Sequence, residues 1–483
     1  MELSKYQEDI KVAYKTTSMN LVINACPGSG KTFTLLMLAK NTSPMKSSIF
    51  LAFNKSIQEE LSRKLPTHVK ARTLHSLGMS ILPKYHSCNL KVTDGKTFKL
   101  CRNKLDLSRF NTLKKQNSYM MELCQLVDIV RMNLITDYSS LTEVAGEYDI
   151  LATPEHCLDV EKCMDILNTY NRKLKDGSMI DFCDMLYLCK DLPPLAFPKY
   201  DVVFVDECQD LNPMQKFLVD KIRKSTGRFI AVGDKKQAIY SFMGSNLKSF
   251  EEFEKSENTL CLPLSRTYRC SKSVTECANG VFPDSMEYLE DAPEGEVREG
   301  KISEIEEGDI VICRNNKPLV QLFLTLVVQG KKSHIYGKDY GEKLLKMIEP
   351  IEGMSYFQVK DHFDRQREQM LSDLKDSGIS RPQLHPKVVN FDEMVEIIFI
   401  LLDHFVTFSE CYKTIKELFS DEVGGITLMT CHKSKGLEAR RVFFYQKELI
   451  PSPYATSQQM LYAEKCLYYV AVTRAKESLI YIQ

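Results

Sequence analysis

The chain has 483 residues, 43% of them hydrophobic and 27% charged, the composition of an ordinary globular protein of two to four domains. Its 64 lysines and arginines equal its 64 aspartates and glutamates, so any surface that binds a polyanion must be local. The sixteen cysteines form no C-x-x-C pair, which argues against zinc sites, iron–sulfur sites and disulfide scaffolds. The N-terminus lacks signal-peptide features, and the longest apolar run, 319–328, is too short to span a bilayer. We expect a soluble intracellular protein, of cytoplasm or nucleus, with no membrane partner.

The first part of the chain alternates predicted strands with predicted helices. After an initial helix come a strand at 21–23, a helix at 33–38, a strand at 48–53, a helix at 56–65 and a strand at 69–73. Such alternation predicts a parallel α/β sheet. Residues 85–175 show helical periodicity instead, with helices at 119–134 and 156–174, so we expect an inserted helical subdomain. Two apolar strands, 200–205 and 228–232, then return to the first sheet.

A second α/β unit is expected beyond residue 260. The acidic stretch 285–309 is typical of a solvated linker or hairpin. It is followed by a strand at 310–313, a helix at 318–328, a strand at 333–336, and later strands at 425–430, 441–445 and 479–482. The fold class is therefore α/β, with two parallel-sheet lobes, each interrupted by a mainly helical insertion. The expected boundaries are 1–84 and 176–262 for the first lobe, 85–175 for its insertion, 263–340 and 421–483 for the second lobe, and 341–420 for a short second insertion.

A glycine-rich segment joins the first predicted strand to the next predicted helix. Its sequence is Ala25-Cys26-Pro27-Gly28-Ser29-Gly30-Lys31-Thr32, a phosphate-binding loop with Ala25 in place of the usual first glycine. In such a loop, backbone N–H groups and the helix N-terminus face the phosphates, and Lys31 reaches the β- and γ-phosphates. The Thr32 hydroxyl would bind Mg²⁺. The alternative is an ordinary glycine turn before a helix.

Two adjacent carboxylates, Asp206 and Glu207, follow the buried strand at 200–205. The carboxyl end of a strand is where parallel α/β sheets place their catalytic groups. Asp206 would hold Mg²⁺, directly or through water, and Glu207 would orient and deprotonate an attacking water. A plain acidic loop is the alternative.

The strand at 228–232 leads into a second polar loop that contains Gln237 and two aromatic residues, Tyr240 and Phe242. A neutral glutamine near the γ-phosphate can report the presence of that phosphate through its hydrogen bonds. The aromatic side chains would stack on a nucleic-acid base. The alternative is a Tyr/Phe pair that faces the core.

Further segments, in the same order along the chain, resemble the superfamily 1A DNA helicases of the UvrD/Rep/PcrA type. The matching segments are Gln7, Phe53-Asn54-Lys55, Thr73-Leu74-His75, Asp181-Phe182-Cys183-Asp184-Met185-Leu186, Tyr268-Arg269, Thr430-Cys431-His432-Lys433-Ser434-Lys435-Gly436-Leu437-Glu438 and Tyr469-Val470-Ala471-Val472-Thr473-Arg474-Ala475-Lys476. They run from residue 7 to residue 476, so the resemblance organises nearly the whole chain, although neither insertion carries a motif.

The resemblance implies two RecA-like P-loop lobes and a role for each matching residue. Gln7 and Tyr268 would hold the adenine of ATP, and Glu438 the ribose. Arg269 and Arg474, from the second lobe, would stabilise charge on the γ-phosphate and act with Lys31, Glu207 and Gln237 in catalysis. The DNA contacts implied by the resemblance are Phe53, Asn54, Thr73, His75, Tyr240, Phe242, Thr430 and His432.

The chain departs from the family pattern at several positions. Met243 occupies the place of a usual arginine, Phe242 that of a frequent tryptophan and Thr267 that of an asparagine. The sequence Ala52-Phe53-Asn54-Lys55 is more similar to the F-box DNA helicase branch than to UvrD itself.

The resemblance implies a helicase that uses ATP and Mg²⁺, moves 3′→5′ on single-stranded DNA, binds single-strand/duplex junctions and acts in repair, replication or recombination. Three alternatives stay open. They are a DNA-dependent ATPase that mainly strips proteins from DNA, a 5′→3′ helicase, and a non-motor module that clamps DNA.

Overall fold

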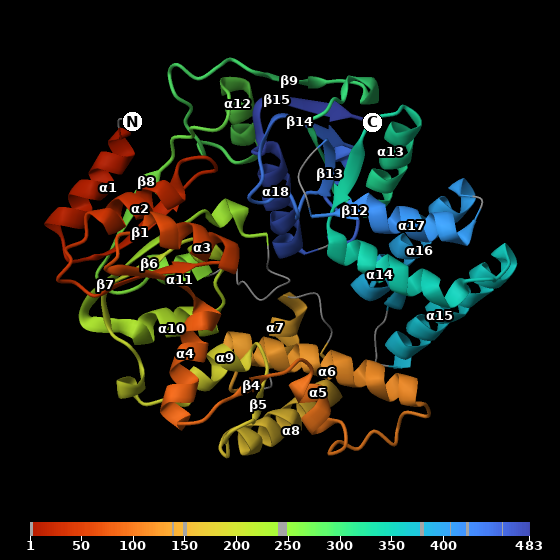
Figure 1. Ribbon diagram of the computed structural model, residues 1–483, viewed down its shortest axis with the longest axis horizontal. Coiled ribbons are helices and arrows are strands. Elements are labelled where there is room, and N and C mark those ends of the chain that lie inside the picture. Colours follow the sequence, from red (N-terminus) through yellow and green to blue (C-terminus); the bar gives the residue numbers. More distant parts are fainter. Residues whose placement is uncertain are drawn as a thin grey trace. The chain divides into compact units, whose positions relative to one another are not determined.

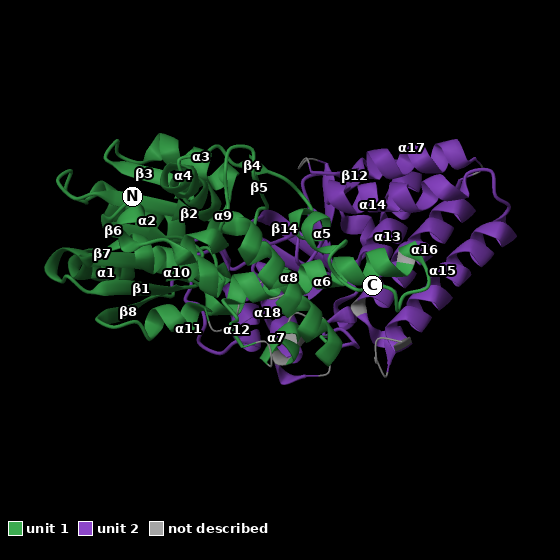
Figure 2. Ribbon diagram, turned by 90° about the horizontal axis from the view of Figure 1, so that it is seen from below, with its two compact units in different colours: residues 1–265 green, residues 266–483 purple. Residues whose placement is uncertain are grey.

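The computed structural model describes residues 3–137, 140–147, 152–239, 249–376, 381–405, 407–421, 425–455 and 457–483 (Figure 1). The chain divides into two compact units, residues 1–265 and residues 266–483 (Figure 2). Within the described ranges, no helix is long and apolar enough to cross a lipid bilayer.

The described part of unit 1 is built on a six-stranded sheet in which all paired strands are parallel, in the order β3-β2-β6-β7-β1-β8. Its strands are β1 (Asn20–Ala25), β2 (Ser48–Ala52), β3 (Val69–Thr73), β6 (Tyr200–Val205), β7 (Arg223–Gly233) and β8 (Thr259–Leu264). Strands β1 and β2 are apolar along most of their length, as expected for strands covered on both faces. Val22 packs in one core cluster and its neighbours Leu21 and Ile23 in another, because successive side chains of a strand point to opposite faces.

Helices alternate with the strands of this sheet along the chain. They are α1 (Lys5–Thr16), α2 (Lys31–Lys40), α3 (Lys55–Lys64), α4 (Leu74–His86), α9 (Asp184–Tyr187), α10 (Pro213–Ile222) and α11 (Ser249–Glu254). A mainly helical region comprises α5 (Lys96–Cys101), α6 (Leu113–Asn133), α7 (Leu141–Glu147) and α8 (Pro154–Asn171), with the short paired strands β4 (Lys91–Val92) and β5 (Met179–Ile180). The 3₁₀ helices are η2 (Leu188–Asp191), η3 (Pro194–Ala196), η4 (Cys208–Asp210) and η5 (Lys235–Gln237).

A buried network of charges ties this helical region to the segment before β6. Lys96, on α5, is fully buried and its Nζ lies 2.6 Å from Asp184 Oδ2. Arg131, on α6, is also buried and donates to Asp181 at 3.0 Å and to Asp184 Oδ1 at 3.1 Å. Buried charges are tolerated when they are paired and hydrogen-bonded in this way. The network therefore holds Asp181 and Asp184, which lie on either side of Phe182 in the sequence.

Unit 2 has its own parallel sheet, seven-stranded within the residues described, in the order β12-β11-β13-β10-β14-β15-β9. Its strands are β9 (Glu296–Glu299), β10 (Ile310–Cys313), β11 (Ser333–Tyr336), β12 (Phe419–Ser420), β13 (Ile426–Thr430), β14 (Ala439–Tyr445) and β15 (Ala475–Ile482). Its helices are α12 (Lys272–Val281), α13 (Asn316–Val328), α14 (Lys338–Ile348), α15 (Tyr356–Asp376), α16 (Pro386–His404), α17 (Phe408–Leu418) and α18 (Gln458–Val472). The 3₁₀ helices are η7 (Ile302–Glu304), η8 (Glu349–Ile351), η9 (Pro382–Leu384) and η10 (Lys447–Leu449). Helices α14 to α17 lie between β11 and β12 in the sequence.

The predicted α/β class with two parallel sheets is confirmed, and two details of the prediction are wrong. Strand β8 pairs with β1, so residues up to Leu264 belong to the first sheet and the second unit begins later than expected. Strand β9 lies inside the stretch expected to be a linker or hairpin and pairs in parallel with β15, which a hairpin cannot do. Both are edge strands, where Pro263 and the charged residues of β9 are compatible with pairing on one side only.

Candidate nucleotide and nucleic-acid sites

The glycine-rich loop connects β1 to α2 at the carboxyl end of the first sheet. Gly28 and Gly30 have φ values of 70° and 81°, in the left-handed region that favours glycine. The Ser29 hydroxyl donates to the Cys26 carbonyl at 2.8 Å and closes the turn. Helix α2 starts directly afterwards at Lys31, so the N-terminus of the helix opens onto the loop as an anion site requires.

The acidic pair that follows β6 contacts the first residues of α2. The Thr32 hydroxyl donates to Asp206 Oδ2 at 2.8 Å, and Lys31 Nζ lies 3.5 Å from Glu207 Oε1. Glu207 has φ 49° and ψ 47°, a left-handed conformation that is uncommon for a non-glycine residue and recurs at functional sites. The structure thus brings together four residues predicted from two distant segments.

Burial dominates the electrostatics of Asp206. Removal from water, with the neighbouring Glu207 charge, raises the pKa of Asp206 to about 6, while the Thr32 hydroxyl and Lys31 oppose this shift. A cation near the carboxylate would reverse this effect, because it favours the charged form.

The residues around Thr32 are suited to Mg²⁺. In the part of the chain that the structure describes, no group of three or more His, Cys, Asp or Glu side chains could hold a metal by itself. Mg²⁺ in nucleotide sites usually takes one or two carboxylates together with phosphate oxygens and waters. The hydroxyl of Thr32 and the carboxylate of Asp206 are oxygen ligands of that kind.

Gln7, predicted to read adenine, is 3% exposed and holds the start of α1. Its Oε1 accepts from the Ser4 N–H at 3.0 Å, and its Nε2 donates to the Thr34 hydroxyl at 3.3 Å. An amide has two N–H groups and an oxygen with two lone pairs. After these contacts it has capacity for one further donated and one further accepted bond, which is what two-point recognition of adenine requires.

Gln237, predicted to lie near the γ-phosphate, is the last residue of η5, which follows β7. Gln237 is buried, and its Nε2 donates to Asp234 Oδ2 at 2.7 Å. Tyr240 and Phe242, predicted to stack on bases, lie outside the described residues, as does Met243.

In unit 2, an ion cluster joins two residues predicted to bind nucleotide. Arg269 Nε donates to Glu438 Oε2 at 2.6 Å, and Lys476 Nζ lies 2.8 Å from Glu438 Oε1. Partial burial raises the pKa of Glu438, but the bonds from Lys476 and Arg269 outweigh it and leave the pKa lowered. Tyr268, beside Arg269, is 42% exposed and available to stack.

Arg474, by contrast, is buried, with 1% of the residue exposed. Its guanidinium donates to the carbonyls of Val470 and Leu437 and to the Thr473 hydroxyl, at 2.7 to 3.2 Å. In this structure these contacts hold the loop after α18 against the segment that contains Glu438.

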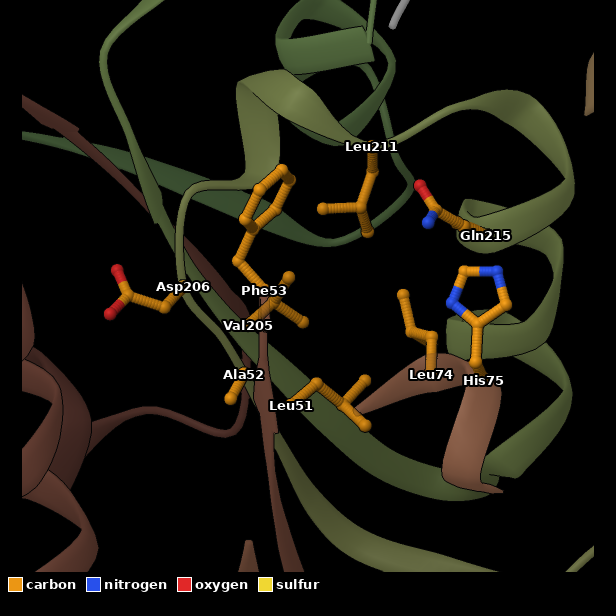
Figure 3. A pocket seen from close by; sticks show the side chains of 9 residues that line it. All are labelled: Leu51, Ala52, Phe53, Leu74, His75, Val205, Asp206, Leu211 and Gln215. Atoms are coloured by element: carbon orange, nitrogen blue, oxygen red, sulfur yellow. The ribbon is translucent and has the colours of Figure 1, made fainter. Parts of the chain in front are cut away.

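Two predicted DNA contacts of unit 1, Phe53 and His75, line a pocket at the carboxyl ends of β2 and β6 (Figure 3). The residues that line it are Leu51, Ala52, Phe53, Leu74, His75, Val205, Asp206, Leu211 and Gln215. In the figure, Asp206 lies on one side, His75 on the other, and the Phe53 ring between them. One predicted Mg²⁺ ligand, Asp206, and two predicted DNA contacts, Phe53 and His75, therefore line the same pocket. Asn54 and Thr73, also predicted to bind DNA, use their side chains to cap α3 and α4.

His75 stacks on Phe182, with ring centroids 3.8 Å apart and an interplanar angle of 20°. Phe182 is 60% exposed. Burial lowers the pKa of His75 to about 4, so the imidazole is neutral at physiological pH. A neutral aromatic pair that includes a largely exposed ring is suited to stack on a base.

The predicted DNA residues of unit 2 lie at the end of β13 and just after it. Thr430 ends that strand, and its hydroxyl accepts from the Lys433 N–H at 3.5 Å. His432 is partly buried, and burial together with the Arg314 charge lowers its pKa to about 3.

Comparison with known proteins identifies the family. Residues 6–258, more than half of the chain, match the UvrD/REP helicase N-terminal domain, and residues 425–482 match the UvrD-like helicase C-terminal domain. The chain belongs to the UvrD/Rep helicase family. The resemblance inferred from the motifs is thereby confirmed.

Individual relatives of this UvrD/Rep family member are distant. F-box DNA helicase protein 1 of Schizosaccharomyces pombe is 27% identical over 95% of this chain and 55% of its own length. ATP-dependent DNA helicase PcrA of Leuconostoc citreum is 26% identical, covering 57% of this chain and 38% of its own. ATP-dependent DNA helicase Rep of Buchnera aphidicola is 23% identical, covering 69% of this chain and 51% of its own length. The chain therefore spans 38% to 55% of the length of these curated relatives.

Two side chains of this UvrD/Rep chain were not among the predicted site residues. Phe182 was noted only as part of a matching segment, although an aromatic residue between two acidic ones was a usable signal. Gln209 lies two residues after Glu207 and contacts it (Nε2 to Glu207 Oε2, 2.6 Å), but one glutamine in an acidic loop gives no sequence signal for such a role.

Proposed function

We propose that this chain is an ATP-dependent DNA helicase that moves 3′→5′ on single-stranded DNA and unwinds duplexes. The observation that carries the proposal is the contact of Lys31 and Thr32 with Glu207 and Asp206. These are the groups that phosphoryl transfer to water needs, and two of the relatives bear the name ATP-dependent DNA helicase.

In the proposed reaction, Lys31 leaves Glu207 for the β- and γ-phosphates of ATP. Thr32 and Asp206 would hold Mg²⁺, which would neutralise charge that develops on the phosphates. Glu207 then accepts a proton from the attacking water, and Gln237 responds to the presence of the γ-phosphate. Gln7 and Tyr268 bind adenine, Glu438 binds ribose, and Arg269 and Arg474 stabilise charge on the transferred group.

DNA binding is proposed to combine stacking with phosphate contacts. Phe53, His75 and Phe182 would contact bases in unit 1, and Thr430 and His432 would contact the strand in unit 2. Binding of this kind tolerates many sequences and weakens with salt. The substrates would be single-stranded DNA and single-strand/duplex junctions.

ATP hydrolysis with and without single-stranded DNA tests the motor activity, with Lys31→Ala as the inactive control. We expect DNA to stimulate the wild type, and Lys31→Ala to bind DNA without turnover, because the cation for the β/γ-phosphates is missing. Turnover near the wild-type rate in Lys31→Ala would overturn the phosphate-loop assignment.

Strand displacement on duplexes with a single 3′ or 5′ tail tests the direction. We expect unwinding from the 3′ tail. A preference for the 5′ tail would reverse the assigned direction. DNA-stimulated hydrolysis without displacement of either duplex would favour a translocase that strips proteins from DNA.

A further inference from the structure

The side chain of Gln209 lies among polar groups that follow two neighbouring strands of unit 1. It is almost fully buried. Its Nε2 donates to Glu207 Oε2 at 2.6 Å and to Asp210 Oδ2 at 3.2 Å. Its Oε1 accepts from the backbone N–H of Asp234 at 3.0 Å. One buried amide therefore joins the segment after β6 to the segment after β7.

These partners allow the Gln209 amide only one orientation. Two carboxylates face its nitrogen and a backbone donor faces its oxygen. Exchange of the two atoms would place an oxygen against both carboxylates and two N–H groups against each other. The contact with Glu207 is consequently specific, and a residue that lacks either atom cannot replace it.

Gly233, the last residue of β7, provides the space for this contact. A Cβ atom at this position would lie 2.4 Å from Gln209 Oε1. Its backbone is not in the left-handed region, so the glycine is required by the close approach of the amide and not by its own φ.

The hydrogen bonds continue from Asp234 to the end of the loop. The Asp234 carboxylate accepts from the Lys236 N–H at 2.9 Å and from Gln237 Nε2 at 2.7 Å. Glu207 and Gln237, both assigned to the γ-phosphate region above, are thus the two ends of one series of contacts, with Gln209 and Asp234 between them.

We propose that Gln209 is a positioning residue for ATP hydrolysis, which holds the Glu207 carboxylate in place and fixes it relative to residues 234–237. The inference rests on the proposed function, because it assumes that Glu207 accepts the proton of the attacking water. The left-handed backbone of Glu207 makes such an anchor necessary, since a strained residue keeps its conformation only when its surroundings determine it.

The test compares Gln209→Met with the wild type and with Gln116→Met in the full chain. Methionine keeps the length of the side chain and removes both polar atoms. Gln116 is a matched control, since its Nε2 also donates to two acceptors, the carbonyls of Leu107 and Phe110, at 3.4 and 3.3 Å, but far along the chain from the acidic loop. The measurements are kcat with saturating single-stranded DNA, the Kd of a fluorescent ATP analogue and the melting temperature.

We expect kcat to fall about tenfold to a hundredfold in Gln209→Met, the effect of one lost hydrogen bond to a charged group, with the nucleotide Kd within about twofold of wild type. Gln116→Met should keep the wild-type kcat. A wild-type kcat in Gln209→Met, or equal losses of nucleotide affinity and kcat, would overturn the inference. If Gln209→Met does not fold, Gln209→Asn is used instead. Its side chain keeps the amide but is one methylene shorter, so it cannot reach both Glu207 and the Asp234 N–H. We expect it to show the same result, a lowered kcat with a nearly unchanged nucleotide Kd. A wild-type protein without ATPase activity would instead refute the proposed function itself.

Discussion

At the scale of single residues, the Thr32 hydroxyl has the most direct link to chemistry, since it bonds the carboxylate assigned to Mg²⁺. Thr32→Val keeps the shape of the side chain and removes the oxygen. We expect the ATPase kcat to fall by about tenfold to a hundredfold or more, because one hydrogen bond to a charged group and one proposed metal ligand are lost. Thr32→Ser, which keeps the hydroxyl, should stay close to wild type. Steady-state hydrolysis at saturating Mg²⁺ checks this, and equal rates for the two variants would contradict it.

His75 is predicted to make folding stability sensitive to acid. Its pKa is lowered to about 4 in the folded chain, from an ordinary value of about 6.5 when unfolded. Between these values the unfolded chain binds more protons, so stability is lost as the pH falls through this range. His75→Phe keeps an aromatic ring against Phe182 and removes the titration. We expect the drop in melting temperature from pH 7.5 to pH 5.0 to be smaller in this variant.

Two other titratable side chains, His432 and Asp206, also make the stability of the fold depend on pH. His432, with its pKa lowered to about 3, destabilises the fold on acidification in the same way. Asp206 has a raised pKa, so its contribution has the opposite sign and favours the folded chain as the pH falls through about 6. Both groups are unchanged in His75→Phe, so the difference between variant and wild type reports His75 alone. An unchanged pH dependence would contradict the lowered pKa of His75.

Residue types in a known order were enough to select Lys31, Thr32, Asp206 and Glu207 as candidates for one site, because phosphate chemistry uses such groups after a strand, and the structure places them in contact. Contacts between distant segments could not be predicted in the same way. The stack of His75 on Phe182 joins residues 107 positions apart, and only the fold brings them together. The ion pair of Arg269 with Glu438 has the same character, since each residue had been assigned to the nucleotide separately.

At the scale of elements, the buried network between α5, α6 and the segment before β6 stabilises the helical region of unit 1. We expect Lys96→Met to lower the free energy of unfolding by about 3–5 kcal/mol, because it leaves buried carboxylate charge without one of its cations. Lys64→Met is the matched control. It breaks an exposed lysine–glutamate pair on α3 and should cost no more than about 1 kcal/mol. Urea unfolding measures both, and equal effects would contradict the stabilising role of the network.

Predictability from the sequence also differs among the elements. Central strands such as β2 and β6 are apolar along most of their length, and their positions were predicted within one residue at each end. The edge strands β8 and β9 were missed because Pro263 interrupts one and charged residues make up most of the other. An edge strand needs hydrogen bonds on one side only, so its sequence is weakly constrained and its pattern gives little signal.

At the scale of the whole molecule, each unit has a hydrophobic core of its own. One set of buried side chains surrounds β1, β2 and β6 in unit 1, and another surrounds β10, β13 and β14 in unit 2. The residues proposed to act in ATP hydrolysis nevertheless come from both units: Lys31, Thr32, Asp206 and Glu207 from the first, and Arg269 and Arg474 from the second. If the proposal holds, hydrolysis is a property of the complete chain and not of the phosphate-loop unit alone.

Arg269 gives the sharpest test of that dependence, since its neighbour Lys476 contacts the same carboxylate. Arg269 and Lys476 both pair with Glu438, at 2.6 and 2.8 Å, but only Arg269 is assigned to the γ-phosphate. We expect Arg269→Gln to lower kcat roughly 10³- to 10⁵-fold, the range for an arginine that stabilises phosphoryl transfer, with ATP affinity little changed. Lys476→Met should stay within about threefold of wild type, because an exposed ion pair contributes little. Similar losses in both variants would mean that the arginine acts only through Glu438, and hydrolysis would then depend on unit 2 through its ion cluster instead of through a cation at the phosphate.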